Sequence, residues 1–381
     1  MLLQRSLSVL FMTRNTFCRM AWSSVRVVGV LMVWVLTTAM AGGPCRVEQP
    51  SQTTSPMMVR ILVGDCSEED RRSLAISAQD VFVALQLGEG VELDGVTLTG
   101  DLMLDDLPLE PIPDEDQLPA FVRERFDRER LAEVRVVKGP LILRDVEVEG
   151  VLATNLLNRG YVIVQGPVSI TGSTFQRSLD FSRTIFQDSV DFSENTIGYE
   201  GFFIQAVFLK NANFTHTAFG THSRFHKAVF AGKALFQEAV FHGIAEFLEV
   251  GFEKEADFSH ARFVQGTGFS GSQFREVPNF SDATFERETY FRFSQFEKGA
   301  NFRGGVFRMA ADFTEATFGG ESDFSRVVFE EPPQFTDEGL ANQFRSPNGL
   351  QDPKYQAALF VLAGLFLVFF YFLLRKKRRK E

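Results

Sequence analysis

Histidine, cysteine and tryptophan are scarce in this chain of 381 residues, with five, three and two copies respectively. No H-E-x-x-H, G-x-S-x-G or phosphate-binding G-x-x-x-x-G-K motif is present, and the calcium-binding pattern G-G-x-G-x-D is also absent. We therefore predict no catalytic, cofactor-binding or metal site and no enzymatic activity. The five histidines are interpreted as surface polar residues: His216, His222, His226, His242 and His260.

Phenylalanine, with 42 copies, is abundant instead and follows a strict spacing. From Phe203 to Phe335 it recurs at alternating steps of five and six residues, and the series extends back to Phe175 with Ile197 in one place. On an α-helix such steps turn about 500° and 600°, so the rings would scatter around the axis. In one flat strand the odd step would place alternate rings on opposite faces. The chain must therefore turn a corner between consecutive rings, which predicts a solenoid.

Small or compact residues lie two positions before each ring, as in Ala256-Asp257-Phe258-Ser259-His260 and Ala311-Asp312-Phe313-Thr314-Glu315. This pattern resembles the pentapeptide-repeat family over about 160 residues. The resemblance implies an all-β fold, a right-handed quadrilateral β-helix with four units per coil. The chain departs from the family pattern by one extra residue in every second unit, which we expect to bulge a corner of the coil. The predicted core residues are Phe214, Phe219, Phe225, Phe230, Phe236, Phe241, Phe247, Phe252, Phe258, Phe263, Phe269, Phe274 and Phe280.

Two eleven-residue units give a coil of 22 residues, so Phe214, Phe236 and Phe258 should lie on one face. About seven coils at roughly 4.8 Å each predict a column about 35 Å long. Ser259 is expected to point outward on a solvated face, beside the polar position of Asp257.

Upstream of the phenylalanine series, residues 91–104 and 140–151 alternate apolar with polar residues or glycine and predict first coils built on aliphatic side chains. Ser77 should cap a short helix that runs to Leu87 and closes the end of the core. Residues 105–138 form a partly helical insertion. We interpret it as a solvated excursion, the alternative being a segment that carries a specific contact.

The two ends predict a location at the membrane. Arginines, an apolar run at 27–36 and Ala39-Met40-Ala41 are typical of a signal peptide, with an uncleaved anchor as the alternative. Residues 357–374 are long and apolar enough to span a membrane, and the basic run 375–380 should hold the tail in the cytoplasm. The predicted segments are 1–41, signal peptide; 42–76, linker or N-terminal segment; 77–170, capping helix, first coils and insertion; 171–336, phenylalanine-centred solenoid; 337–356, juxtamembrane linker; 357–374, transmembrane helix; 375–381, basic tail.

The charge distribution agrees with that location. The formal net charge is −10, but ten basic residues lie in the two terminal segments, which leaves 29 basic and 48 acidic residues elsewhere. Such an acidic domain is poorly suited to nucleic acid. Cys18 would leave with the signal peptide, while Cys45 and Cys66 would reach an oxidising compartment, where we expect them to form a disulfide.

The expected function is a membrane-anchored, extracytoplasmic and non-catalytic scaffold without a cofactor. Its partner would be a protein or another component of the cell envelope, contacted by a rigid repetitive surface. Two alternatives remain open at this point. One is a β-helix enzyme acting on polysaccharide, and the other is a DNA mimic that binds topoisomerases, as some members of the similar family are. The oligomeric state is not predicted.

Overall fold

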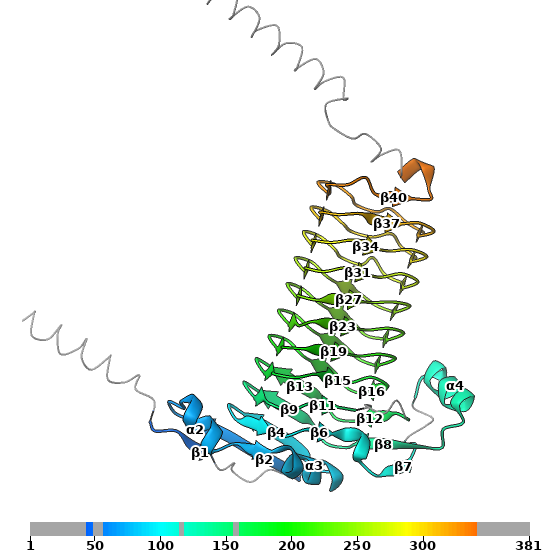
Figure 1. The fold of residues 1–381 in the computed structure, drawn as a ribbon. Coiled ribbons are helices and arrows are strands. Elements are labelled where there is room, and N and C mark those ends of the chain that lie inside the picture. The colour runs from blue at the N-terminus through cyan, green and yellow to red at the C-terminus, as the bar shows by residue number, and fades with distance from the viewer. Residues whose placement is uncertain (1–42, 49–55, 114–117, 155–159, 341–381) are drawn as a thin grey trace, which may run out of the picture.

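The computed structural model describes residues 43–48, 56–113, 118–154 and 160–340. Within them, short strands stack in four parallel sheets around a single core and form a straight column (Figure 1). Sheet 1 consists of β1 (Arg46–Glu48), β2 (Met57–Val63), β4 (Gly90–Asp94), β9 (Leu141–Arg144), β13 (Val168–Thr171), β17 (Val190–Asp191), β21 (Ala212–Asn213), β25 (Ala234–Leu235) and β29 (Ala256–Asp257). Sheet 2 consists of β3 (Ile76–Ser77), β5 (Thr97–Thr99), β10 (Glu147–Val148), β14 (Thr174–Phe175), β18 (Thr196–Ile197), β22 (Ala218–Phe219), β26 (Val240–Phe241), β30 (Arg262–Phe263), β33 (Thr284–Phe285), β36 (Val306–Phe307) and β39 (Val328–Phe329).

The other two sheets complete each coil. Sheet 3 consists of β6 (Leu102–Met103), β11 (Leu152–Ala153), β15 (Leu179–Asp180), β19 (Glu200–Phe202), β23 (His222–Arg224), β27 (Ile244–Glu246), β31 (Thr267–Gly268), β34 (Thr289–Tyr290), β37 (Ala311–Phe313) and β40 (Gln334–Phe335). Sheet 4 consists of β7 (Leu109–Pro111), β8 (Glu133–Val137), β12 (Val162–Val164), β16 (Thr184–Phe186), β20 (Val207–Phe208), β24 (Val229–Phe230), β28 (Gly251–Phe252), β32 (Gln273–Phe274), β35 (Gln295–Phe296) and β38 (Thr317–Phe318).

Strands pair with the strand one coil away, and the register advances by 22 residues per coil through the phenylalanine series, as in Ala212 with Ala234 and Ala234 with Ala256. The pairing is parallel except between β1 and β2 and between β7 and β8. The protein is therefore mostly β, with stacked parallel sheets that form a β-solenoid. The handedness of the coil stays a prediction.

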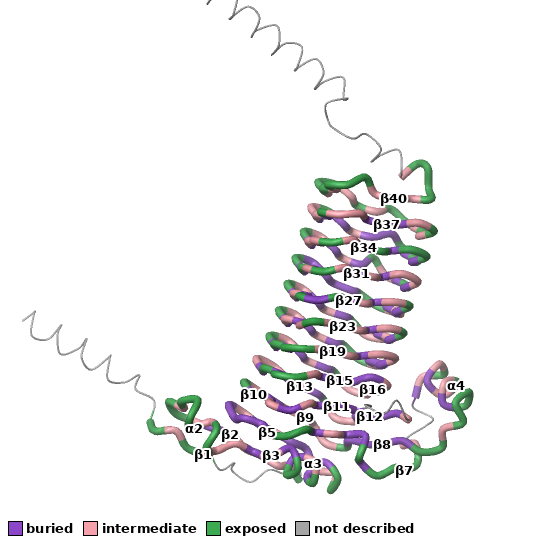
Figure 2. The backbone as a smooth tube through the Cα atoms, viewed as in Figure 1, coloured by how far each residue is buried: buried purple, intermediate pink, exposed green. Residues whose placement is uncertain are grey.

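Phenylalanine rings fill the interior, and buried segments recur from coil to coil as far as Phe313, while the last coil has only intermediate and exposed residues (Figure 2). Phe258 is fully buried and stacks on Phe236 and Phe280, with ring centroids 4.8 and 5.0 Å apart and interplanar angles of 2° and 6°. Phe247 and Phe269 meet the same ring edge to face at 5.3 Å. All thirteen phenylalanines predicted for the core are buried, none more than 1% exposed.

Two kinds of corner alternate around the coil. The tight corners, from sheet 1 to 2 and from sheet 3 to 4, close with a hydrogen bond such as that from the Ala239 N–H to the Phe236 carbonyl, 3.1 Å. The second residue after each ring there has a positive φ, as Glu238 does at 56°. The extra residue of the six-residue step lies at the other two corners, so two opposite corners of each coil are widened rather than one.

The expectation that Ser259 lies on a solvated face is wrong. Ser259 is 8% exposed, and its backbone N–H donates to Oδ1 of Asp257 at 2.9 Å. The carboxylate of Asp257, itself 5% exposed, folds back over the tight corner that follows Phe258. The position after a ring is therefore part of the turn and does not belong to the flat outer face.

The N-terminal end of the column is closed by α3 (Ala78–Gln86), where a capping helix was predicted. Ser77 caps it by accepting a hydrogen bond from the Asp80 N–H at 3.1 Å, and Val81, Ala84 and Leu85 are buried against the first coils. The 3-10 helix η2 (Leu104–Asp106) follows β6.

The segment 42–76, interpreted as a linker or N-terminal segment, contains strands and a helix where the structure describes it. Its strands β1 and β2 extend sheet 1, and α2 (Glu68–Ser73) begins with a capping box formed by Ser67 and Asp70. Cys45 and Cys66 form a disulfide across this segment, with Cα atoms 4.7 Å apart.

Among the described residues no helix is long and apolar enough to cross a membrane. The predicted signal peptide at 1–41, the predicted span at 357–374 and the basic tail lie outside the described residues.

The stacked core predicts a steep dependence of stability on the central rings. Phe258→Ala removes a ring that contacts six others and should lower the free energy of unfolding by about 3–5 kcal/mol. Phe329→Ala should cost less, because Phe329 is only partly buried. The measurement is the urea midpoint of residues 43–340. The exposed Lys254→Ala, as the control, should stay within about 0.5 kcal/mol. Equal losses at Phe258 and Lys254 would contradict the stacked interior.

Candidate functional site

Side chains on the outer faces form ladders, because each residue lies beside the residue 22 positions away. On sheet 1, Nδ2 of Asn279 donates to Oδ1 of Asp257 at 3.1 Å, and Nδ2 of Asn301 donates to Oδ1 of Asn279 at 2.9 Å. Each of these Oδ1 atoms also accepts the backbone N–H two residues further on, at 2.9 to 3.1 Å. The recurring aspartates and asparagines therefore hold the tight corners and are committed to structure.

Asp180 occupies the same kind of position on sheet 3, with 8% exposure. Its Oδ1 accepts the Ser182 N–H at 2.7 Å. Burial raises the pKa of the Asp180 carboxyl above its ordinary value, while the hydrogen bonds from Ser182 act in the opposite direction. The charged form is thus held in a poorly solvated place.

Charged side chains on the outer surface also pair along the column axis. Arg275 lies between Glu253 and Glu297, at 2.6 and 3.0 Å, on successive coils. Arg308 bridges Glu286 and Glu330 in the same way, at 2.8 and 3.2 Å. Each exposed pair contributes little to stability. Together they give a surface on which opposite charges alternate from coil to coil.

The histidines pair with single carboxylates and do not gather. Nε2 of His222 lies 3.0 Å from Glu246, while His216 and His226 lie 3.5 and 3.8 Å from Glu238 and Glu249. Within the described parts of the chain, no three His, Cys, Asp or Glu side chains are arranged to hold a metal ion.

The insertion is packed against the column, so its interpretation as a solvated excursion is wrong. Its helix α4 (Ala120–Glu129) buries Val122 and Phe126, at 0% and 1% exposure. These two side chains belong to a second apolar cluster on the outer face of sheet 4, together with Leu118, Val134, Val136, Tyr161, Ile163, Ile185 and Val207. The helix therefore covers a row of apolar residues that point outward from successive coils.

A polar cluster fixes the C-terminal end of α4. Glu129 accepts hydrogen bonds from Tyr161 Oη at 3.0 Å and from Arg183, whose guanidinium lies 4.2 Å from the centre of the Tyr161 ring. Arg125 donates to the Gln205 carbonyl at 3.2 Å. Burial raises the pKa of the Tyr161 hydroxyl, so it stays a neutral donor. The cluster could not be found from the sequence, because its members lie 22 to 80 positions apart.

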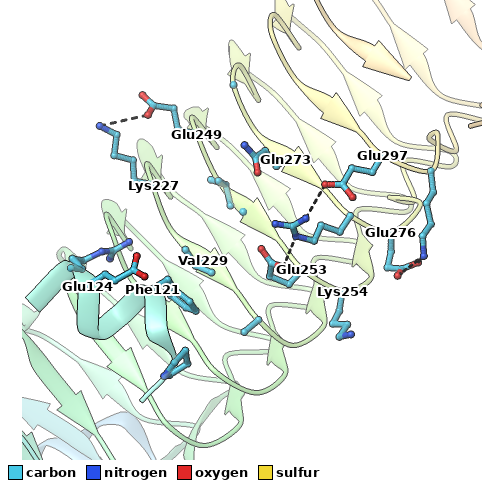
Figure 3. A pocket seen from close by; sticks show the side chains of 18 of the residues that line it. Phe121, Glu124, Lys227, Val229, Glu249, Glu253, Lys254, Gln273, Glu276 and Glu297 are labelled. Carbon is cyan, nitrogen blue, oxygen red and sulfur yellow. Dashed lines mark hydrogen bonds and ion pairs between the residues drawn. The ribbon is translucent and has the colours of Figure 1, made fainter. Parts of the chain in front are cut away.

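Beyond α4 the outer face of sheet 4 continues as an open groove of about 1110 Å³ (Figure 3). Phe121 and Glu124 of α4 form one wall, while Val229 and Gly251 lie on its floor. Charged side chains of both signs line the rest, and several are paired, as Lys227 is with Glu249 at 3.6 Å. Its lining residues do not form a nucleophile and base pair or a set of metal ligands. The groove can therefore offer contact surface, but its residues do not assemble reaction chemistry.

Comparison with known protein families identifies the repeat. The family model for pentapeptide repeats, in nine copies, matches residues 225–273. The resemblance drawn from the phenylalanine spacing is thus confirmed, and the chain contains pentapeptide repeats. Searches of the curated proteins and of the solved structures found no match. Members of this family are generally non-catalytic repeat proteins.

The raised pKa of Asp180 predicts a pH-dependent effect of Asp180→Asn. Asparagine keeps the acceptor for Ser182, as Asn213 does for the Thr215 N–H at 3.0 Å. A carboxyl whose folded pKa is raised stabilises the fold below its unfolded value, near 3.8, and loses that contribution as pH rises through the folded value. The melting temperature of the variant minus that of the unsubstituted protein should therefore increase as the pH is raised from 3.5 to 7.

Asp323→Asn serves as a control of opposite sign. Hydrogen bonds from Ser325 lower the pKa of Asp323, so this carboxylate stabilises the fold above pH 3.8 and loses its contribution as pH falls. The variant should be less stable than the unsubstituted protein near neutral pH and should match it in acid. A difference for Asp180→Asn that stays constant over the whole pH range would show that burial does not act on its charge.

Proposed function

We propose that this protein is a membrane-anchored, non-catalytic scaffold whose column lies outside the cytoplasm and binds a protein or another component of the cell envelope. The observation that supports this most is the ordered outer surface. Its exposed charged side chains are paired in ladders that run along the column, such as Glu253, Arg275 and Glu297. A rigid surface of this kind suits extended contacts with a partner.

The arrangement of charge favours a scaffold over a polysaccharide enzyme. Such an enzyme needs two carboxyl groups, or a carboxyl and a base, held across a groove at a fixed separation. In the groove beside α4, Glu253 and Glu297 are both neutralised by Arg275. Both carboxylates are therefore engaged in ion pairs with one guanidinium and are not held apart across the groove.

The membrane part of the proposal rests on the sequence of the two ends. The apolar run 357–374 is followed by six consecutive basic residues, which favours retention of that end in the cytoplasm. The Cys45–Cys66 disulfide supports an oxidising compartment for the column. DNA mimicry would require the opposite side of the membrane.

The orientation can be tested with an inserted protease site. We expect a site-specific protease added to intact cells or spheroplasts to cut at a site placed within 337–356. A tag after Glu381 should stay protected from general proteolysis, because the tail is cytoplasmic. As the control, the same site between Glu381 and the tag should be cut only after lysis. Cutting at the second site alone would reverse the orientation and favour the DNA mimic.

A further inference from the structure

Exposed apolar side chains lie on the outer face of sheet 3 and at its tight corner to sheet 4. Ile244, at the start of β27, is 47% exposed, and Tyr290 and Phe293, two coils further along the column, are 42% and 59% exposed. Among the described residues, no helix covers this face between Arg224 and Asp312; α4 packs on sheet 4 instead (Figure 1). We call this area, from Arg224 to Glu315 on sheet 3 and its corner to sheet 4, the sheet 3 face.

Phe293 is in an unfavourable conformation for its residue type. Its φ is 58°, a left-handed value that is strained for a bulky residue. The equivalent corner position one coil earlier is Gly271, and Glu249 and Glu315 occupy it in other coils. The exposed ring buries little against the column, so folding does not account for its presence. Strained residues that the fold does not need are typical of contact sites.

The coil between Ile244 and Tyr290 carries almost no side chains on this face. Gly266, Gly268 and Gly271 occupy its outer positions. A Cβ at Gly268 would lie 3.0 Å from Cδ2 of Leu248, so the Leu248 side chain lies next to the Gly268 backbone. The face is thus hollow at its centre, with Leu248 on one side and Tyr290 and Phe293 on the other. Such a hollow permits close approach of another backbone.

We propose that the occupant of this face is a second copy of the chain, docked antiparallel about a two-fold axis through the Gly268 coil. The axis lies in the contact plane and runs along the strands, so a residue k coils above it meets the residue k coils below it in the other copy. The exposed Lys227 and Glu315 are each two coils from Gly271, on opposite sides. They therefore face each other across the contact, and each pair occurs twice.

The other charges of this region are engaged within the column. Arg224 and Asp312 lie two coils from Gly268 on opposite sides, but Arg224 pairs with Glu246 and Asp312, 8% exposed, pairs with Arg292. Glu249, Glu288 and Arg292 meet the apolar Phe293, Ile244 and Leu248 of the other copy. Glu246 meets Tyr290, whose hydroxyl can donate to a carboxylate. The central coil, which meets itself on the axis, has no charged side chain on this face. No like charges are brought together.

Other placements of the axis are less favourable. An axis midway between the Gly268 and Tyr290 coils would oppose Glu246 to Asp312 and Glu249 to Glu315. Parallel docking would oppose each residue on the central line of the face, such as Glu246, to its own copy. Like charges placed in direct opposition suppress a binding mode. An axis midway between the Glu246 and Gly268 coils would oppose Lys227 to Phe293 and Glu315 to Gln205, so both of these opposite-charge contacts would be lost. The contact between Lys227 and Glu315 thus favours the antiparallel arrangement centred on Gly268.

This arrangement has a consequence that rests on the proposed function. The C-terminal ends of an antiparallel pair lie at opposite ends of the assembly. Two copies that are each anchored through residues 357–374 would therefore belong to membranes that face each other. The pairing itself depends on the column alone, so it can be tested in detergent without any assumption about orientation in the membrane.

The first test uses charge reversal in the full-length chain. Two forms with different tags are purified separately in mild detergent, mixed and co-precipitated. Unsubstituted copies should co-precipitate, while Lys227→Glu copies alone or Glu315→Lys copies alone should lose at least tenfold. Mixing Lys227→Glu with Glu315→Lys should restore the association, because both contacts regain opposite charges. Absence of pairing between unsubstituted copies, or no recovery in the mixed pair, would overturn the proposal.

The second test separates the contact from the fold. Phe293→Gly removes the ring and suits the positive φ, so association should fall at least tenfold while the melting temperature stays equal or rises. Asp282→Gly is the matched control, because Asp282 has a φ of 55° at the other tight corner of the same coil. It should leave association unchanged. A lower melting temperature for Phe293→Gly, or unchanged association, would assign Phe293 a role within the column and overturn the proposed contact.

Discussion

One spacing has to satisfy two interactions at once in this protein. Parallel strands of neighbouring coils are joined by backbone hydrogen bonds, and the phenylalanine rings of the same coils stack face to face inside. In the centre of the column the stacked rings lie 4.8 Å apart, as Phe214 and Phe236 do, which is the distance that paired strands adopt. Aromatic rings also favour an offset stack at this separation. Because neither interaction strains the other, the same coil can be repeated many times.

This agreement explains why the interior could be predicted from the sequence. The steps of five and six residues identify which side chain points inward on each face. A shift of one residue in the pairing between coils would turn these rings outward, so only one register buries them. Ala256 and Phe258 are informative because other coils repeat the same pattern, a small residue two positions before a ring, as in Ala234 and Phe236. The solenoid and the capping helix after Ser77 follow from such local patterns, while the four sheets and the 22-residue coil are implied by the resemblance to pentapeptide repeats.

Features outside the repeat could not be predicted in the same way. The positive φ at tight corners is occupied by glycine only at Gly271 and Gly304 in the phenylalanine series, so residues such as Glu238 and His260 give no signal of it. Ile163 and Ile185 belong to the outer apolar cluster that α4 covers, and no pattern in the sequence indicates that these isoleucines form a contact site for a helix. The polar cluster of Glu129, Tyr161 and Arg183 joins distant segments, and a single sequence contains no sign of that contact.

The half-coil repeat also determines how the gene can change in length. Loss or gain of 22 residues within the phenylalanine series would shorten or lengthen the protein by one whole coil and keep every face in place. A change of eleven residues would preserve the interior equally well, but everything above it would turn by half a revolution and sheets 1 and 3 would exchange. The free energy of unfolding would be nearly the same after a change of eleven residues as after a change of 22. Selection for a stable fold would therefore not remove insertions or deletions of eleven residues. Such changes would be selected only through function, according to whether surfaces such as that around Gly268 still face the same way.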